Sequence, residues 1–240
     1  MPTLAESSAA LQNRVQQADG AAEISRLEAR LPPLLSIIAG MVDLTGFFTL
    51  GHVFTAHVTG NLVVAAADAV HGGPFHLAQA LAIPVFMLAL AGVSHRRRLG
   101  LVPPLLLVQF LLLAAVLVFS EIARPSSAPE GIMAGVAIMI AVSAMACQYA
   151  LLRLAMPRVV STAVMTGNLT NTVLSLLDSL SERRALLPAD AGRLKRSLHL
   201  LVGFLLGCVV AAYAVSVLGD WAWALRVALS GAAFTWFRCA

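Results

Sequence analysis

The chain has 240 residues, of which 59% are hydrophobic and only 12% are charged. Soluble domains carry roughly 45 to 50% apolar and about 25% charged residues, so this composition excludes an ordinary soluble domain. The net charge is +4, but the basic residues form short clusters between apolar blocks, which is typical of membrane-protein loops and not of a nucleic-acid-binding surface. We therefore expect an all-α integral membrane protein of a bacterial inner (plasma) membrane, with the lipid bilayer and no nucleic acid as a partner.

Residues 1–30 are polar and mix acidic with basic side chains, so they do not resemble a cleavable signal peptide. We expect them to form a cytoplasmic tail that is disordered or contains a short amphipathic helix. Apolar residues at Ile24, Leu27 and Leu31 would make up one face of that helix.

Eight apolar segments follow the tail, and none of them alternates apolar with polar residues as the strands of a membrane barrel would. They lie at residues 34–54, 58–70, 77–94, 101–120, 132–152, 159–180, 198–217 and 221–237. Most approach the ~20 residues that a helix needs to cross ~30 Å of hydrocarbon. If all eight cross the membrane, at least one basic cluster lies outside the cell in either orientation, against the preference of Lys and Arg for the cytoplasmic side.

The conflict disappears if the second and sixth segments enter and leave the membrane on the same side. The clusters at 96–98, 153–158 and 183–196 then all become cytoplasmic, as do both termini. The second segment, 58–70, has the length of a re-entrant helix, whereas the assignment of the sixth rests on charge and symmetry. We expect six transmembrane helices plus two re-entrant or broken helices.

Both special segments contain nearly the same eight residues. Six positions are identical between Thr55-Ala56-His57-Val58-Thr59-Gly60-Asn61-Leu62 and Thr162-Ala163-Val164-Met165-Thr166-Gly167-Asn168-Leu169. Polar residues are scarce in this chain, so duplication explains the recurrence better than chance. The expected halves are residues 31–122 and 131–240, joined by an extracytoplasmic loop at 123–130. With three full spans in each half, the second copy is inverted, giving an inverted 3+3 repeat.

In inverted-repeat folds, solutes and coupling ions bind near the midplane, where interrupted helices expose backbone groups. Glycine permits a sharp turn, asparagine can cap the following helix, and the helix amino terminus offers N–H groups to a polar or anionic ligand. The structural alternative is that both repeated segments only cap and pack broken helices. The candidate substrate- or ion-binding residues are Asp43, Thr55, Thr59, Gly60, Asn61, Gln148, Thr162, Thr166, Gly167 and Asn168.

Asp43 lies near the middle of the first apolar segment, where an ionised carboxylate costs about 2.5 to 3.5 kcal/mol on the insertion scale. It could bind a proton or a sodium ion during transport, or it could be a neutral, hydrogen-bonded packing residue. Gln148 is the comparable polar residue of the fifth segment, and interhelical hydrogen bonding explains it equally well.

Three groups of residues form a distinctive pattern. They are Ala39-Gly40-Met41-Val42-Asp43 with Phe47, then Phe54-Thr55-Ala56-His57-Val58-Thr59-Gly60-Asn61, and finally Gln148 and Thr162 with Met165-Thr166-Gly167-Asn168-Leu169. This pattern resembles the YoaK-like family of uncharacterised bacterial multi-span membrane proteins, over roughly residues 34–237. The resemblance implies a membrane-embedded fold of similar length and leaves the activity open.

Other polar and small residues favour structural roles. His52 and His57 are five residues apart and would not stack on one helix face, so we expect no metal site and no cofactor. The pairs Gly203-x-x-x-Gly207 and Gly131-x-x-x-Gly135 are typical of close helix packing. The tryptophans look like interfacial anchors of the last segment; they are Trp221, Trp223 and Trp236.

Duplicated halves, interrupted helices and a midplane carboxylate together favour a secondary transporter or channel for a small polar solute. The alternative is a ligand-responsive structural or signalling membrane protein that moves nothing, and a homo-oligomer is compatible with both. An intramembrane enzyme is less favoured. Ser230 before Gly231 resembles a serine-protease elbow, but Ala228 stands where a glycine is expected.

Overall fold

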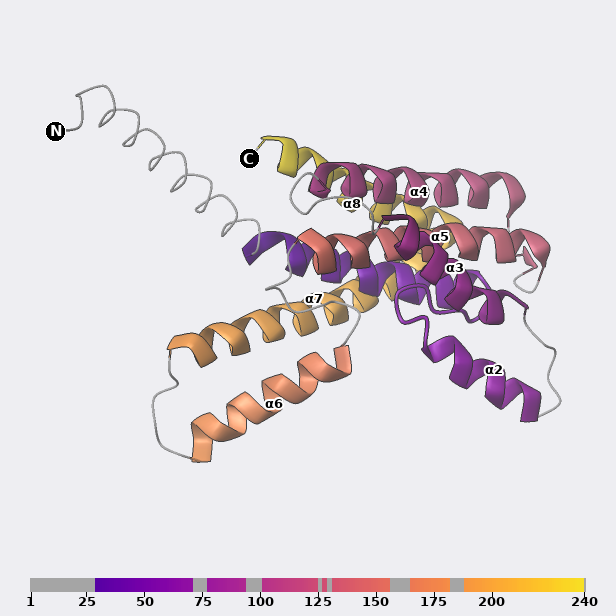
Figure 1. Cartoon of the computed structure of the whole chain (residues 1–240). Helices are drawn as coiled ribbons and strands as arrows, with labels where there is room; N and C mark the ends of the chain where they lie inside the picture. The colour runs from indigo at the N-terminus through magenta and orange to yellow at the C-terminus, as the bar shows by residue number, and fades with distance from the viewer. Residues whose placement is uncertain are drawn as a thin grey trace, which may run out of the picture.

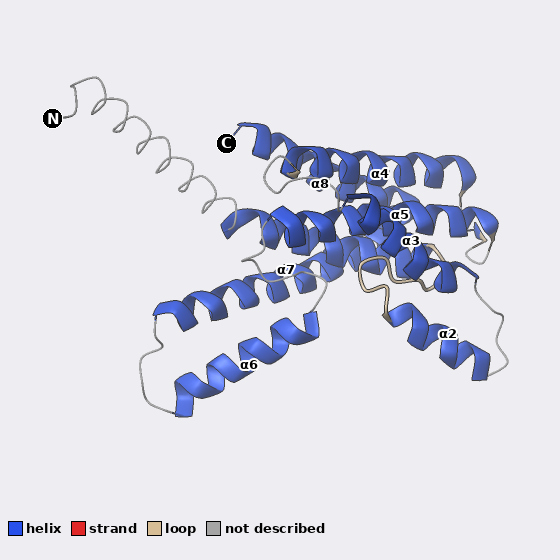
Figure 2. Ribbon diagram, viewed as in Figure 1, coloured by secondary structure: helices blue, strands red, loops and turns tan. Residues whose placement is uncertain are grey.

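The computed structural model describes residues 29–70, 77–93, 101–124, 127–128, 131–155, 165–181 and 188–239. All regular structure in these ranges is helical, as expected from the sequence (Figure 2). After a first helix, Ala29–Thr49, come α2 (Gly60–Val70), α3 (Leu77–Val93), α4 (Val102–Ala123), α5 (Ile132–Ala150), α6 (Met165–Ser181), α7 (Pro188–Leu218) and α8 (Trp223–Cys239). A π-helical turn, η2 (Leu151–Ala155), extends α5, and a 3₁₀ turn, η3 (Gly219–Ala222), separates α7 from α8.

Four stretches are long and apolar enough to cross a membrane: Ala29–Thr49, Val102–Ala123, Ile132–Leu154 and Leu194–Phe237. The last has 44 residues, roughly 66 Å of helix, about twice the thickness of the hydrocarbon layer. It is broken at Gly219, whose φ of +57° is left-handed, and α8 returns toward the side where α7 began (Figure 1). The multi-pass membrane character is thus supported, while the count of six full spans stays a prediction.

The core is a bundle in which α4 packs against both α5 and α8, and α3 packs against α5. The buried face of α5 consists largely of small residues, including Ala134, Ala137, Ala141 and Ala144. Small side chains let neighbouring helices approach closely where lipid supplies no hydrophobic driving force between them. The exposed large apolar residues lie on the outer faces, for example Leu111 and Val118 of α4, as expected of surfaces that face lipid.

The first helix and α7 cross in near backbone contact. A Cβ added at Gly40 would run into the carbonyl oxygen of Phe204, and one at Gly207 into that of Ile37. At Gly203 the added Cβ would lie 3.0 Å from the carbonyl oxygen of Pro33. The prediction that Gly203 and Gly207 serve helix packing is confirmed.

The other glycine pair does not pack in this way. Gly131 lies just before α5, and a Cβ at Gly135 would meet only the Cβ of Ala78, at 4.0 Å.

The expectation that the tryptophans are interfacial anchors also needs correction. Trp221 is exposed, but Trp223 is completely buried, because it belongs to the face of α8 that packs inward.

The two helices that begin within the repeated segments, α2 and α6, lie outside the main bundle (Figure 1). Both begin toward the middle of the molecule and run outward in opposite directions in this view. Helix α6 packs against α7, and α2 packs against α3. Each is short, with 11 residues in α2 and 17 in α6, so each lies at or below the length that a full span requires.

Three further expectations from the sequence concern the amino-terminal tail, the basic cluster at 96–98 and the connection at 123–130. Leu31 is buried within the first helix and so does not belong to a separate amphipathic helix. Residues 1–28 and the cluster at 96–98 lie outside the described residues. Helix α4 ends at Ala123 and α5 begins at Ile132, which agrees with a connection at 123–130 and leaves its side of the membrane a prediction.

Substituting the two glycine pairs tests the close crossing. Gly207→Ala should destabilise the protein by about 1 to 3 kcal/mol, because its methyl group would press on the backbone of Ile37. Gly135→Ala is the matched control and should be neutral or stabilising by up to about 1 kcal/mol, since alanine favours helix and the site has room. Thermal unfolding of the detergent-solubilised protein measures both; equal melting temperatures for the two variants would contradict this packing.

Candidate functional site

The chain reverses direction where the first helix ends. Gly51 and His52 both have left-handed φ angles, of 80° and 59°. The amide of Leu50 donates to the carbonyl oxygen of Gly46 at 2.9 Å, which closes the last helical turn. Gly46 also leaves room for the returning chain, because a Cβ there would lie 3.1 Å from Cγ2 of Thr55. The reversal therefore brings the first copy of the repeated segment beside the first helix.

Asp43 binds this returning segment through both carboxylate oxygens. Its Oδ1 accepts hydrogen bonds from the amide of Thr55 at 2.7 Å, the amide of Ala56 at 2.6 Å and the Thr55 hydroxyl at 3.1 Å. Its Oδ2 lies 2.5 Å from Nδ1 of His57. The carboxylate is buried, and these donors replace the water that an ionised group would otherwise need.

His57 connects the buried carboxylate to the surface of the protein. Its side chain is 27% exposed, against 5% for the side chain of Asp43. Its ring packs edge-on against Phe204 of α7, with ring centroids 5.0 Å apart. The imidazole thus lies between α7 and the first helix, with one nitrogen on Asp43.

Asn61 holds the same loop from the other end. Its Oδ1 accepts a hydrogen bond from the amide of Phe54 and its Nδ2 donates to the carbonyl oxygen of Phe54, both at 2.8 Å. Asn61 is completely buried, and a Cβ at Gly60 would lie 3.1 Å from the Phe54 ring. These two hydrogen bonds form a clamp that satisfies backbone groups that lipid cannot satisfy. This is the structural role named above as the alternative for the repeated segments.

The structure brings together Asp43, Thr55 and Asn61 of the predicted site. Thr59 is exposed and Gly60 half-buried, and their peptide groups form the turn into α2. In the second copy, Thr166 is exposed, its carbonyl oxygen accepting from the Thr170 hydroxyl at 2.9 Å.

The structure describes the other residues of the second copy only in part. Gly167 is half-buried near the start of α6. Thr162 and the side chain of Asn168 lie outside the described residues. The hydrogen bonds to Asp43 described above all come from residues 55–57, in the first copy.

Gln148 ties three helices together. Its Oε1 accepts from Nε2 of Gln109 on α4 at 2.8 Å, and its Nε2 donates to the carbonyl oxygen of Leu35 at 2.9 Å. Both ends of the amide are therefore used within the protein. This arrangement agrees with the interhelical hydrogen bonding that the sequence left as an alternative.

Sequence reasoning missed a buried arginine on α8. Arg226 is completely buried; its Nε donates to the carbonyl oxygen of Met41 at 3.1 Å and its Nη2 to the hydroxyl of Thr45. Met41 and Thr45 are one turn apart, so Asp43 between them points from nearly the opposite side of the first helix. The signal was an arginine within an apolar segment, the same criterion that identified Asp43.

Two other features of the sequence concern a metal site and Ser230. No group of three or more His, Cys, Asp or Glu side chains there is arranged to hold a metal ion. The Ser230 hydroxyl is buried with no hydrogen-bond partner among them, and Gly231 packs against the ring of Phe110. The residues around Ser230 therefore pack α8 against α4.

The Asn61 clamp gives a graded prediction. Asn61→Ala leaves the amide and carbonyl of Phe54 unpaired in a buried place, so we expect a loss of about 1 to 3 kcal/mol for each group in the free energy of unfolding. Asn61→Asp keeps an acceptor for the amide and should fall between. Thr59→Ala in the same segment is the control and should change stability little, since Thr59 is exposed. Equal melting temperatures for the Asn61→Ala and Thr59→Ala variants would rule out the clamp.

Comparison with known proteins places the chain in a family. The family described as "Protein of unknown function (DUF1275)" matches residues 31–236. The UPF0700 transmembrane protein YoaK of Bacillus subtilis (strain 168) is 58% identical over 31 residues, which make up 13% of this chain and 14% of that relative. No solved structure matches the chain. The resemblance predicted from the repeated segments is confirmed, and the chain belongs to the DUF1275 family of uncharacterised membrane proteins.

Proposed function

We propose that this protein is a proton-coupled secondary transporter for a small polar solute, in which Asp43 and His57 together carry the proton. One observation carries the proposal: a buried carboxylate at a helix break lies 2.5 Å from a histidine that is partly exposed. Ionisable residues inside membranes mark proton and ion pathways by default, and histidine is the side chain that changes charge near neutral pH.

The surroundings of Asp43 favour a proton over a sodium ion. Hard cations bind to sets of oxygen ligands. Around Asp43, however, Oδ1 already accepts three N–H or O–H groups and Oδ2 faces a ring nitrogen. A cation would have to displace these donors, whereas a proton can bind to the Asp43–His57 pair without removing the ligands.

The same hydrogen bonds would couple the proton to the conformation of the loop. A charged carboxylate accepts hydrogen bonds roughly twice as strong as a neutral group does. A proton on Oδ2 of Asp43 would therefore weaken the hold of this carboxyl group on the amides of Thr55 and Ala56. Because that loop leads directly into α2, the proton would bias the position of a helix that lies outside the main bundle (Figure 1).

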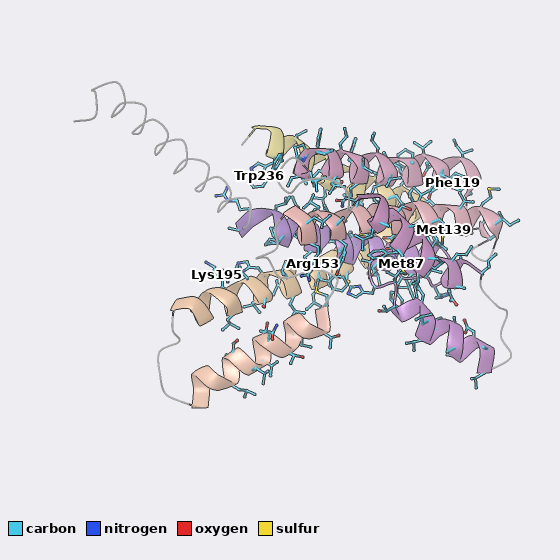
Figure 3. All side chains as sticks on the ribbon, in the orientation of Figure 1. Met87, Phe119, Met139, Arg153, Lys195 and Trp236 are labelled. Carbon is cyan, nitrogen blue, oxygen red and sulfur yellow. The ribbon has the colours of Figure 1, made fainter. Side chains whose placement is uncertain are left out.

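We also propose the finer topology that the sequence suggests: six spans, two broken helices in inverted halves, both termini cytoplasmic and insertion in the inner membrane. The opposite outward directions of α2 and α6 support inverted halves (Figure 1). Arg153 and Lys195 lie toward one end of the bundle, away from Phe119 and Met139, which supports a common cytoplasmic side (Figure 3). Labelling of single cysteines at 95–100 and 183–196 should place both segments on the cytoplasmic side.

One observation favours the alternative of a ligand-responsive protein without transport. Both carboxylate oxygens of Asp43 have partners, and Asn61 is hydrogen-bonded to Phe54. These contacts suit a rigid protein as well as one that changes conformation. The two proposals differ in whether any solute crosses the membrane. A bound solute that stabilises the protein but never crosses would favour the alternative.

Flux measurements on the purified protein in liposomes test the proposal. A pH-sensitive dye inside the liposomes should report proton movement when a gradient of a transported polar solute is imposed. Asp43→Asn keeps an acceptor for the loop amides but loses the charge, and His57→Gln loses the imidazole ring, so both should reduce this proton flux to the level of protein-free liposomes.

His199→Gln is the matched control, since His199 is exposed and bonds to the carbonyl oxygen of Lys195 on its own helix. It should leave the flux unchanged. Solute-driven proton flux that persists in the Asp43→Asn and His57→Gln variants, with normal folding of both, would contradict the assignment of the proton site.

A further inference from the structure

The buried guanidinium of Arg226 has a group that the protein does not satisfy. Its Nε and Nη2 donate to the first helix, but Nη1 has no hydrogen-bond partner among the described residues. An unpaired charged donor in a low-dielectric interior is costly. We therefore expect Nη1 to donate a hydrogen bond to an acceptor outside the contacts described above.

Two neighbouring residues on α8 also have buried polar atoms that lack a hydrogen-bond partner. The indole Nε1 of Trp223 and the hydroxyl of Ser230 are completely buried, with no partner among the described residues. Positions 223, 226 and 230 are three and four residues apart, so they lie along one face of the helix. The guanidinium carbon lies 5.4 Å from the centre of the Trp223 ring, which places these two side chains together.

The unsatisfied groups are of one chemical kind. Arginine and tryptophan nitrogens can only donate hydrogen bonds, and a serine hydroxyl can donate as well as accept. A set of three buried donors, one of them positively charged, needs an acceptor that carries negative charge. This face of α8 therefore has the polarity of an anion site.

The carboxylate of Asp43 does not neutralise Arg226, because it binds the loop on the other side of the first helix. Glu121, near the end of α4, also has a buried oxygen without a partner, but no ion pair joins it to Arg226. The described hydrogen bonds of Arg226 go to a neutral carbonyl oxygen and a neutral hydroxyl.

We propose that Arg226, Trp223 and Ser230 form a binding site for an anion, either a small dissolved anion such as chloride or phosphate or the phosphate group of an anionic lipid. The site is distinct from the Asp43–His57 pair and does not depend on transport. The anion would accept hydrogen bonds from Arg226 Nη1, Trp223 Nε1 and Ser230 Oγ and would neutralise the guanidinium between the first helix and α8.

Thermal unfolding of the delipidated full-length protein in detergent tests the proposal. Sodium chloride, sodium phosphate or phosphatidylglycerol is titrated against sodium gluconate at constant ionic strength. The wild type should show a saturable rise in melting temperature with at least one of these probes. A rise with phosphatidylglycerol alone identifies the lipid phosphate as the anion, and a rise with either salt identifies a dissolved one.

Conservative variants separate specific binding from general salt effects, which act on all variants alike. Trp223→Phe keeps the ring under the guanidinium and loses the donor, and Ser230→Ala loses the hydroxyl. Each should weaken the apparent anion affinity roughly tenfold, the value of one hydrogen bond to a charged group, without lowering stability in gluconate. Arg226→Gln should abolish the anion-dependent rise.

Two results would overturn the proposal. One is a wild-type melting temperature that responds to none of the probes, with Glu121→Gln strongly destabilising, which would make Glu121 the counter-charge of Arg226. The other is an anion-dependent rise of unchanged midpoint in both Trp223→Phe and Ser230→Ala, which would place the anion elsewhere.

Discussion

The carboxylate of Asp43 supplies the hydrogen bonds that the backbone of Thr55 and Ala56 needs where helical structure is interrupted. In lipid there is no water to do this, so an interrupted helix requires a protein acceptor at the break. Asn61 does the same for both polar groups of Phe54. The path of the chain from the first helix into α2 therefore depends on two polar side chains that hydropathy alone would count as unfavourable.

The first helix is the element on which these interactions converge. It approaches α7 through Gly40 and Gly207 at backbone contact and is tied to α5 by Gln148. It also lies between a carboxylate on one side and the Arg226 guanidinium on the other. These contacts fix the position of the first helix relative to α5, α7 and α8.

Much of this architecture follows from the sequence. Apolar segment lengths predicted each helix, and the isolated charge at Asp43 indicated a polar centre because lipid penalises such residues. Its partner could not be predicted in the same way. His57 reaches Asp43 only because Gly51 and His52 reverse the chain, and local sequence does not specify where a reversed chain will pack.

The other differences have similar causes. The sequence predicted Trp223 to be an interfacial anchor and did not identify Arg226, since only the packing of α8 shows that their face is buried. The sequence could not decide whether Gln148 binds a ligand or a neighbouring helix, because both roles need a polar side chain. The helices that it joins are also far apart in sequence. Tertiary packing decides whether a polar residue in a membrane helix binds a ligand or a neighbouring helix.

The central claim is that Asp43 and His57 share a proton in the native protein. Infrared difference spectra of the reconstituted wild type between acidic and alkaline buffer test it most directly. The account predicts imidazole and carboxyl bands that change together and that disappear in both Asp43→Asn and His57→Gln. Spectra in which these bands do not change with pH, or survive in both variants, would contradict it.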